Sequence, residues 1–244
     1  MSALSTPLEA VIDPVGAIPR AIDERRWGAA VLLVAILTAL SGVAVALKVD
    51  PSGPVLAKLA MTGELGKATE REVDEAIEQA QRVAIVASVA KGVFVVPLVV
   101  LLIAVALKIT AWLTGKKAPF AACFTAAALS MLPVALFHLV ELVSALRQST
   151  LSPAMAEALV PTSLAALKPG APPKWLRVYG ALDVVNLWSA LVLGLGFAAA
   201  TKWKPWRGAA LGVFLYVLFA GAFLIGLPGL MAQGPGGGPG MGGP

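Results

Sequence analysis

Four ionisable side chains lie inside otherwise apolar stretches of this sequence: Lys91, His138, Glu141 and Asp183. His138 and Glu141 are three residues apart, and Asp183 and Asn186 have the same spacing, so each pair would share one helix face. Charged groups at membrane depth tend to face a partner or a cavity, because an unpaired charge there is costly. We therefore predict an intramembrane polar network of Lys91, His138, Glu141, Asp183 and Asn186, near the outer boundary. Three readings stay open: a packing network, a polar cavity, or groups facing headgroups and water.

The sequence offers little for catalysis or cofactor binding. It has one Cys and one His, so a disulfide framework or a Cys-based zinc site within the chain is excluded, and a metal site is not expected. Nucleotide-binding loops and the H-E-x-x-H and G-x-S-x-G motifs are not found. The net charge of +5 is spread over loops without a basic stripe, which argues against nucleic acid. We predict no catalytic residue, cofactor, metal or nucleotide.

The elements that must position these side chains are transmembrane helices. The 244 residues are 58% hydrophobic and 14% charged, whereas a soluble domain carries about 25% charged residues. Apolar stretches of about 20 residues predict an all-α polytopic protein with five spans. We place the spans at about residues 27–47, 86–107, 120–146, 181–200 and 209–230, after an amphipathic lead-in (1–26). A charged helix at about 69–85 and a Pro-rich loop at 147–180 would be external, and the Gly/Pro-rich tail 231–244 disordered.

Basic residues predict the orientation. Lys116 and Lys117, and later Lys202, Lys204 and Arg207, occupy short connections without acidic residues. Five spans place them on the same side as the N-terminus, which should be cytoplasmic because Lys and Arg near span ends resist translocation. We therefore predict a cytoplasmic N-terminus and an external C-terminus.

Proline and glycine predict the shapes and contacts of the spans. Pro97 and Pro133 lie mid-span, and each would remove a helical hydrogen bond and kink its helix. Gly208 and Gly212 are four residues apart, and Gly196 has the same spacing from Ala200. Small residues at this spacing permit close helix contact, and we expect packing within the chain rather than dimerisation.

Three segments together resemble the Yip (Ypt-interacting protein) family of small polytopic membrane proteins. They are LEAVIDPVGAIPRAIDERRW (8–27), FAACFTAAALSMLPVALFHLVELV (120–143) and ALDVVNLWSALVLGLGFAAATKW (181–203). The third is the most specific, and the positions carried over are Asp183, Asn186, Trp188 and Gly196. The chain departs from the family in its Gly/Pro tail and at Val184-Val185, where family members often have an aromatic residue.

The resemblance implies five helices with a cytoplasmic N-terminus, in agreement with the charge distribution. Eukaryotic members act in vesicle traffic and bind Rab-type GTPases through a longer N-terminal region than the 26 residues before the first span here. The resemblance and the Ala, Gly and Pro content suggest a bacterial relative in the inner membrane, with an accessory role in an ABC-type export complex or in membrane organisation. We expect a non-enzymatic protein whose partners are membrane lipids and other integral membrane proteins. The alternative is a small transporter or channel subunit that uses the polar residues as a path.

Overall fold

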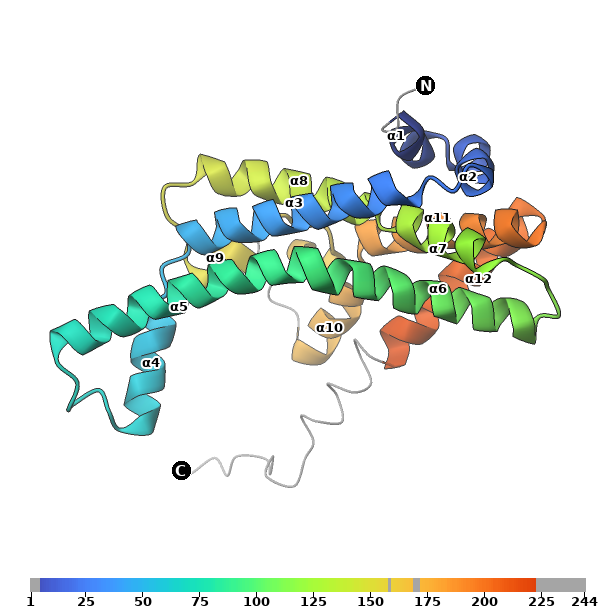
Figure 1. The fold of residues 1–244 in the computed structure, drawn as a ribbon. Helices are drawn as coiled ribbons and strands as arrows, with labels where there is room; N and C mark the ends of the chain where they lie inside the picture. Colours follow the sequence, from blue (N-terminus) through green and yellow to red (C-terminus); the bar gives the residue numbers. More distant parts are fainter. Residues whose placement is uncertain (1–4, 158, 169–171, 223–244) are drawn as a thin grey trace, which may run out of the picture.

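The computed structural model describes residues 5–157, 159–168 and 172–222, and its elements are helices (Figure 1). Five helical segments are long and apolar enough to cross a membrane: Trp27–Lys48, Glu70–Leu113, Phe120–Arg147, Val184–Thr201 and Pro205–Ala222. The predicted all-helical fold with five spans is therefore confirmed. The end of the predicted fifth span, the predicted tail 231–244 and parts of the loop 147–180 lie outside the described residues.

The first span is helix α3 (Trp27–Lys48), whose 22 residues correspond to about 33 Å of helix. Its first 21 residues carry no charge, so it can lie in the hydrocarbon core. The buried positions Ala30, Val34, Thr38, Ser41 and Ala44 recur every three or four residues and so form one helix face. Helices α5 and α8 pack against α3, and the residues that α3 leaves exposed, such as Leu32 and Leu40, are apolar.

The second span is one continuous helix made of α5 (Glu70–Ala90), the π-helical turn η1 (Lys91–Val95) and α6 (Val96–Leu113). It begins with a capping box, in which the Thr69 hydroxyl accepts from the Glu72 N–H and the Glu72 carboxylate accepts from the Thr69 N–H. Its 44 residues span about 66 Å, twice the roughly 30 Å of a hydrocarbon core. The N-terminal part of α5 must therefore extend beyond the membrane.

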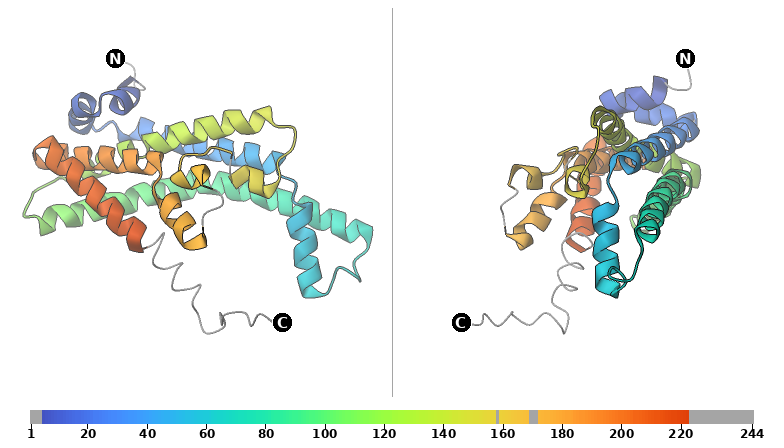
Figure 2. Two further views of the ribbon diagram at one scale, coloured as in Figure 1. Left: turned by 180° about the vertical axis from the view of Figure 1, so that it is seen from behind. Right: turned by 90° about the vertical axis from the view of Figure 1, so that its left-hand side faces the viewer.

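Helix α4 (Ser52–Thr62) packs against this protruding part of α5. We call residues 52–82 the α4–α5 arm. Figures 1 and 2 show the arm projecting from the end of the bundle opposite to the N-terminus.

The third span is the most buried of the five. It consists of α7 (Phe120–Ser130) and α8 (Leu132–Arg147), which are interrupted at Met131. Small residues in α7, among them Ala122, Ala126 and Ala127, are fully or almost fully buried. Because such side chains let backbones approach closely, α7 can contact α3, α6 and α11 at once.

The fourth and fifth spans, α11 (Val184–Thr201) and α12 (Pro205–Phe219), form a tight hairpin. Lys202 adopts a left-handed backbone conformation with φ +57° and ends α11. A Cβ on Gly194 would lie 2.1 Å from the Gly208 carbonyl oxygen, and one on Gly212 2.1 Å from that of Ala190. The glycines predicted at 208 and 212 thus lie against α11 of the same chain, and a Cβ on Gly196 would meet that of Ala126 in α7.

The N-terminal residues form two short helices, α1 (Ser5–Ile12) and α2 (Pro14–Asp23). Helix α2 is amphipathic and buries Ala17, Ile18, Ala21 and Ile22 against α7 and α11. The connection between the third and fourth spans contains α9 (Pro153–Glu157), the 3-10 turn η2 (Leu164–Leu167) and α10 (Pro173–Ala181).

Candidate functional site

His138 and Glu141 form the centre of a polar cluster in the third span. They lie one helical turn apart on α8, and the His138 Nδ1 is 2.8 Å from the Glu141 Oε2. Their side chains are only 12% and 20% exposed, so most of the pair is screened by protein. A hydrogen bond of this kind satisfies the buried carboxylate within its own helix.

Ser41 joins this pair from the first span. Its hydroxyl is fully buried and lies 3.0 Å from the His138 Nδ1, with a second contact to the Thr38 carbonyl oxygen. Ser41 is not among the predicted network residues, although Thr38 and Ser41 form a polar pair with helical spacing in an otherwise apolar span. The contact ties α3 to α8 through side chains as well as through apolar packing.

The arrangement of Ser41, His138 and Glu141 differs from that of a hydrolytic triad. In a triad the hydroxyl binds one ring nitrogen and the carboxylate binds the other, so that a proton can pass from the nucleophile to the base. Here both Ser41 and Glu141 approach the same atom, Nδ1. The geometry is suited to holding two helices together.

Lys91 lies on the second span, where it is exposed. It is the first residue of the π-helical turn, in which the Val96 N–H donates to the Lys91 carbonyl. Gly92 is buried against α3, and a Cβ there would lie 2.4 Å from the Ala35 carbonyl oxygen. Lys91 lies within range of a weak electrostatic effect on Glu141, but no ion pair joins these two described residues.

Pro97 and Pro133 follow the two interruptions in the spans. Pro97 is the second residue of α6, which follows the π-helical turn, and Pro133 is the second residue of α8, which follows the break at Met131. A proline ring removes a donor and clashes with the preceding turn, which accounts for the position of both irregularities. Lys91 precedes Pro97 by six residues, and His138 follows Pro133 by five.

Asp183 and Asn186 lie in a different environment. Asp183 is the N-cap of α11: its carboxylate accepts from the Asn186 backbone N–H at 2.9 Å and from the Thr162 hydroxyl. The Tyr216 hydroxyl donates to the nearby Ala181 carbonyl oxygen. Asp183 makes no hydrogen bond or ion pair with Lys91 or Glu141, so the structure divides the five network residues into two groups.

The α4–α5 arm is a second candidate site, separate from the polar cluster. No residue of α4 or α5 is buried. Asp50 holds the start of α4, where the Ser52 backbone N–H donates to its carboxylate at 2.9 Å. That bond, with a smaller contribution from the Ser52 hydroxyl, holds the pKa of Asp50 below its usual value.

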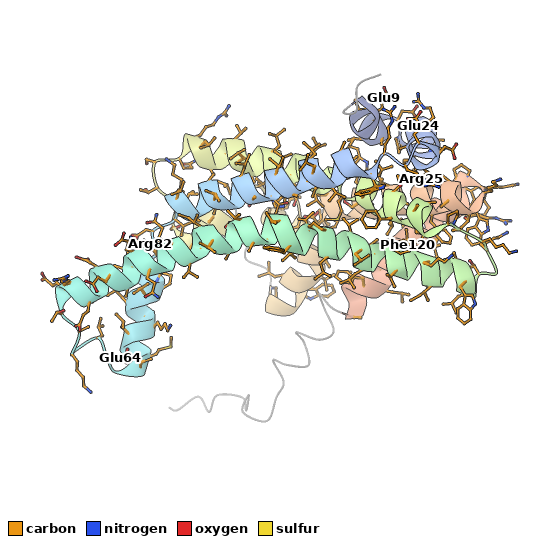
Figure 3. The ribbon with its side chains drawn as sticks, viewed as in Figure 1. Glu9, Glu24, Arg25, Glu64, Arg82 and Phe120 are labelled. Atoms are coloured by element: carbon orange, nitrogen blue, oxygen red, sulfur yellow. The ribbon has the colours of Figure 1, made fainter. Side chains whose placement is uncertain are left out.

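Charges divide between the two ends of the molecule. Figure 3 shows Glu64 and Arg82 on the arm, and Glu9, Glu24 and Arg25 at the opposite end. The N-terminal end carries nine basic residues: Arg20, Arg25, Arg26, Lys108, Lys116, Lys117, Lys202, Lys204 and Arg207. It carries four acidic residues, so its net charge of +5 equals that of the whole chain. The rest of the sequence holds ten of each sign.

Among residues 5–157, 159–168 and 172–222, no group of three or more His, Cys, Asp or Glu side chains could hold a metal ion. The single cysteine, Cys123, is buried in α7.

Comparison with known proteins identifies one family. The model described as the Yip1 domain matches residues 8–227, which covers all five spans. No curated protein and no solved structure matches the chain.

Proposed function

Because the chain belongs to the Yip1 domain family, we propose that it acts by binding other integral membrane proteins. Family membership and the five apolar helices make it an integral membrane protein. Within the proposal, it is a non-enzymatic accessory subunit of an ABC-type export complex, or an organiser of the membrane, in a bacterial inner membrane. Its basic, N-terminal end faces the cytoplasm.

One observation carries this proposal: the chain keeps a long helical arm that contributes nothing to its buried core. The two arm helices bury no side chain, although ordering residues costs conformational entropy. The arm nevertheless has local stabilising interactions of its own, namely a capping box at Thr69 and an Arg71–Glu75 ion pair. Since α5 continues through η1 into α6 as one helix, the arm is a direct extension of the second span. Such a surface is suited to docking against the exposed part of a neighbouring membrane protein.

The arm also offers a mixed surface for a partner. Met61 on α4 is 83% exposed, and α5 presents acidic residues such as Asp74 and Glu78 to solvent. Interfaces commonly combine an apolar anchor with a polar rim, and this helix pair has both.

Photo-crosslinking in native membranes tests the proposal. A photo-reactive residue at Met61 or Asp74 should give a discrete adduct with an exporter subunit, identified by mass spectrometry. The same residue at Leu102, an exposed apolar position of α6, serves as the control. An absence of adducts from both arm positions, with full expression and normal membrane insertion, would contradict the docking role.

The cluster of Ser41, His138 and Glu141 favours a second candidate function, a transporter or channel subunit, because partly buried charges in membranes often mark transport paths. Against it, the buried Thr125 and Ser130 hydroxyls of α7 donate to carbonyl oxygens of their own helix and do not extend the cluster toward the N-terminal end. Flux of protons or ions into proteoliposomes that Glu141→Gln abolishes without unfolding the chain would favour the transporter instead.

A further inference from the structure

A basic hollow lies at the N-terminal end of the bundle, beside the connection between the second and third spans. It has a volume of about 410 Å³ and is lined by Lys108 and Trp112 of α6 and by residues 116–119 of the connection. This volume falls in the range of small-molecule sites. Three of its six lining residues are lysines, so it is suited to an anion.

The end of α6 creates the hollow. Gly115 adopts φ +67°, its N–H donates to the Trp112 carbonyl, and the Lys116 N–H donates to the Ala111 carbonyl. These two bonds form a Schellman motif. The motif turns the chain back, so that Lys116 and Lys117 come to lie beside Lys108.

Two of the three lysines are already held in place. The Lys108 ammonium donates to the Ala118 carbonyl at 2.7 Å, and the Lys116 ammonium lies 5.9 Å from the centre of the Trp203 ring. An ammonium has three donors, so both can still donate to a ligand. Little side-chain entropy remains to be lost when an anion binds at these two positions.

The hollow has no carboxylate of its own. No ion pair of the described residues involves Lys108, Lys116 or Lys117, whereas Arg20 nearby in the N-terminal helices is paired with Glu9. The connection between the spans contains no acidic residue. Among the described residues, no carboxylate therefore pairs with the positive charge of this hollow.

An apolar face of α6 leads directly to the hollow. Leu98, Leu101, Leu102, Val105, Ile109 and Trp112 are all exposed and recur every three or four residues, so they form one stripe along the helix. Trp112, 76% exposed, stands where the stripe meets the lysines, a position typical of tryptophan at a membrane interface. A ligand with an anionic headgroup and long apolar chains fits both the lysine-lined hollow and the apolar stripe of α6.

We propose that this hollow binds one anionic phospholipid of the leaflet that surrounds the N-terminal end. Lys108, Lys116 and Lys117 would donate to the headgroup phosphate, Trp112 would pack against the glycerol region, and the acyl chains would lie along the α6 stripe. The stripe favours a lipid over free phosphate, which has no apolar part to place there. The site does not depend on the proposed protein partner.

Native mass spectrometry of the full-length protein in detergent tests this site, with phosphatidylglycerol as the probe and phosphatidylcholine as the comparison. The wild-type protein should bind phosphatidylglycerol at least about fivefold more tightly than phosphatidylcholine. The combined variant Lys108→Gln/Lys116→Gln/Lys117→Gln should bind it about tenfold or more weakly than the wild type. The matched control, Lys202→Gln/Lys204→Gln/Arg207→Gln, removes the same charge from the same end and should lose less than about threefold.

If the triple variant unfolds, the single variants Lys117→Glu and Lys204→Glu replace the two triples, since both side chains are exposed. Equal losses in the site and control variants would show diffuse attraction and overturn the proposal. Equal binding of the two lipids would also overturn it. Displacement of phosphatidylglycerol by inorganic phosphate would show that the hollow recognises phosphate alone and would overturn its assignment to a lipid.

Discussion

Gly194 and Gly208 meet backbone to backbone where the fourth and fifth spans cross. A Cβ on Gly194 would lie 2.1 Å from the Gly208 carbonyl oxygen, and one on Gly208 would lie 2.2 Å from that of Gly194. Neither position can therefore accept a side chain unless the helices move apart. In a membrane, where water does not drive helices together, such close packing is a main source of helix association.

Replacing Gly208 by Ala should destabilise the protein by about 1–3 kcal/mol, the usual cost of overpacking a tight contact. Thermal or denaturant unfolding in detergent, followed by circular dichroism, measures this change. Gly28→Ala is the matched control, because a Cβ there meets nothing within 4 Å. Similar stabilities for the two variants would mean that α11 and α12 do not cross as described.

Ser41 and His138 should be energetically coupled. Removing either side chain, as Ser41→Ala or His138→Ala, breaks the same contact between α3 and α8, so the effects of the two substitutions should not add. We expect a coupling of about 0.6 kcal/mol, as measured for hydrogen bonds between membrane helices. A double-mutant cycle in detergent determines it, and Ser41→Ala with Thr162→Ala serves as the uncoupled pair. Coupling no larger than in that pair would contradict the contact.

The first turn of α4 should become less stable at low pH. Because folding lowers the pKa of Asp50 below its usual 3.8, its stabilising effect is complete above that pH and is lost as the pH falls through the lower folded-state pKa. Hydrogen-exchange protection of the amides around Ser52 should decrease over this range. The Asp50→Asn variant cannot titrate and should show a flatter profile; unchanged pH dependence in that variant would exclude Asp50 as the source.

Cysteine labelling should report the orientation. In a Cys123→Ser background, Lys117→Cys and Glu70→Cys lie at opposite ends of the second span, so a membrane-impermeant maleimide should reach them from opposite sides. With a cytoplasmic N-terminus, only Glu70→Cys reacts in intact cells, and Lys117→Cys reacts after the membrane is opened. The reverse pattern would overturn the proposed orientation. Labelling of both positions from one side would contradict the second span itself.

The fold could be predicted largely because a membrane restricts it. A helix must satisfy its own backbone hydrogen bonds in hydrocarbon, so length and hydropathy were enough to give five spans. The charged helix predicted at about 69–85 and the span predicted at 86–107 join into one helix from Glu70 to Leu113. The capping box at Thr69 sets its start, and the Schellman motif at Gly115 ends it six residues beyond the predicted span.

The candidate site could be predicted only in part. His138 and Glu141 share a face because they are three residues apart, and this relationship is local. The contacts of Ser41 and Asp183, by contrast, depend on how the helices pack. Ser41 faces His138 because α3 lies against α8, whereas Asp183 ends up beside Thr162 in the preceding connection. No spacing along the chain encodes either contact.

By itself, the sequence determined what each segment must be: apolar runs that span a membrane, a charged helix outside it, and basic connections at one end. These properties follow from solvent preference and backbone hydrogen bonding, which act on each segment separately. Tertiary structure alone decided that Gly194 meets Gly208, that Lys91 approaches the Ser41–His138–Glu141 cluster while Asp183 does not, and that three lysines line one hollow beside Trp112. The physical reason is that each helix offers several faces, and only the joint packing of all the spans decides which of them touch.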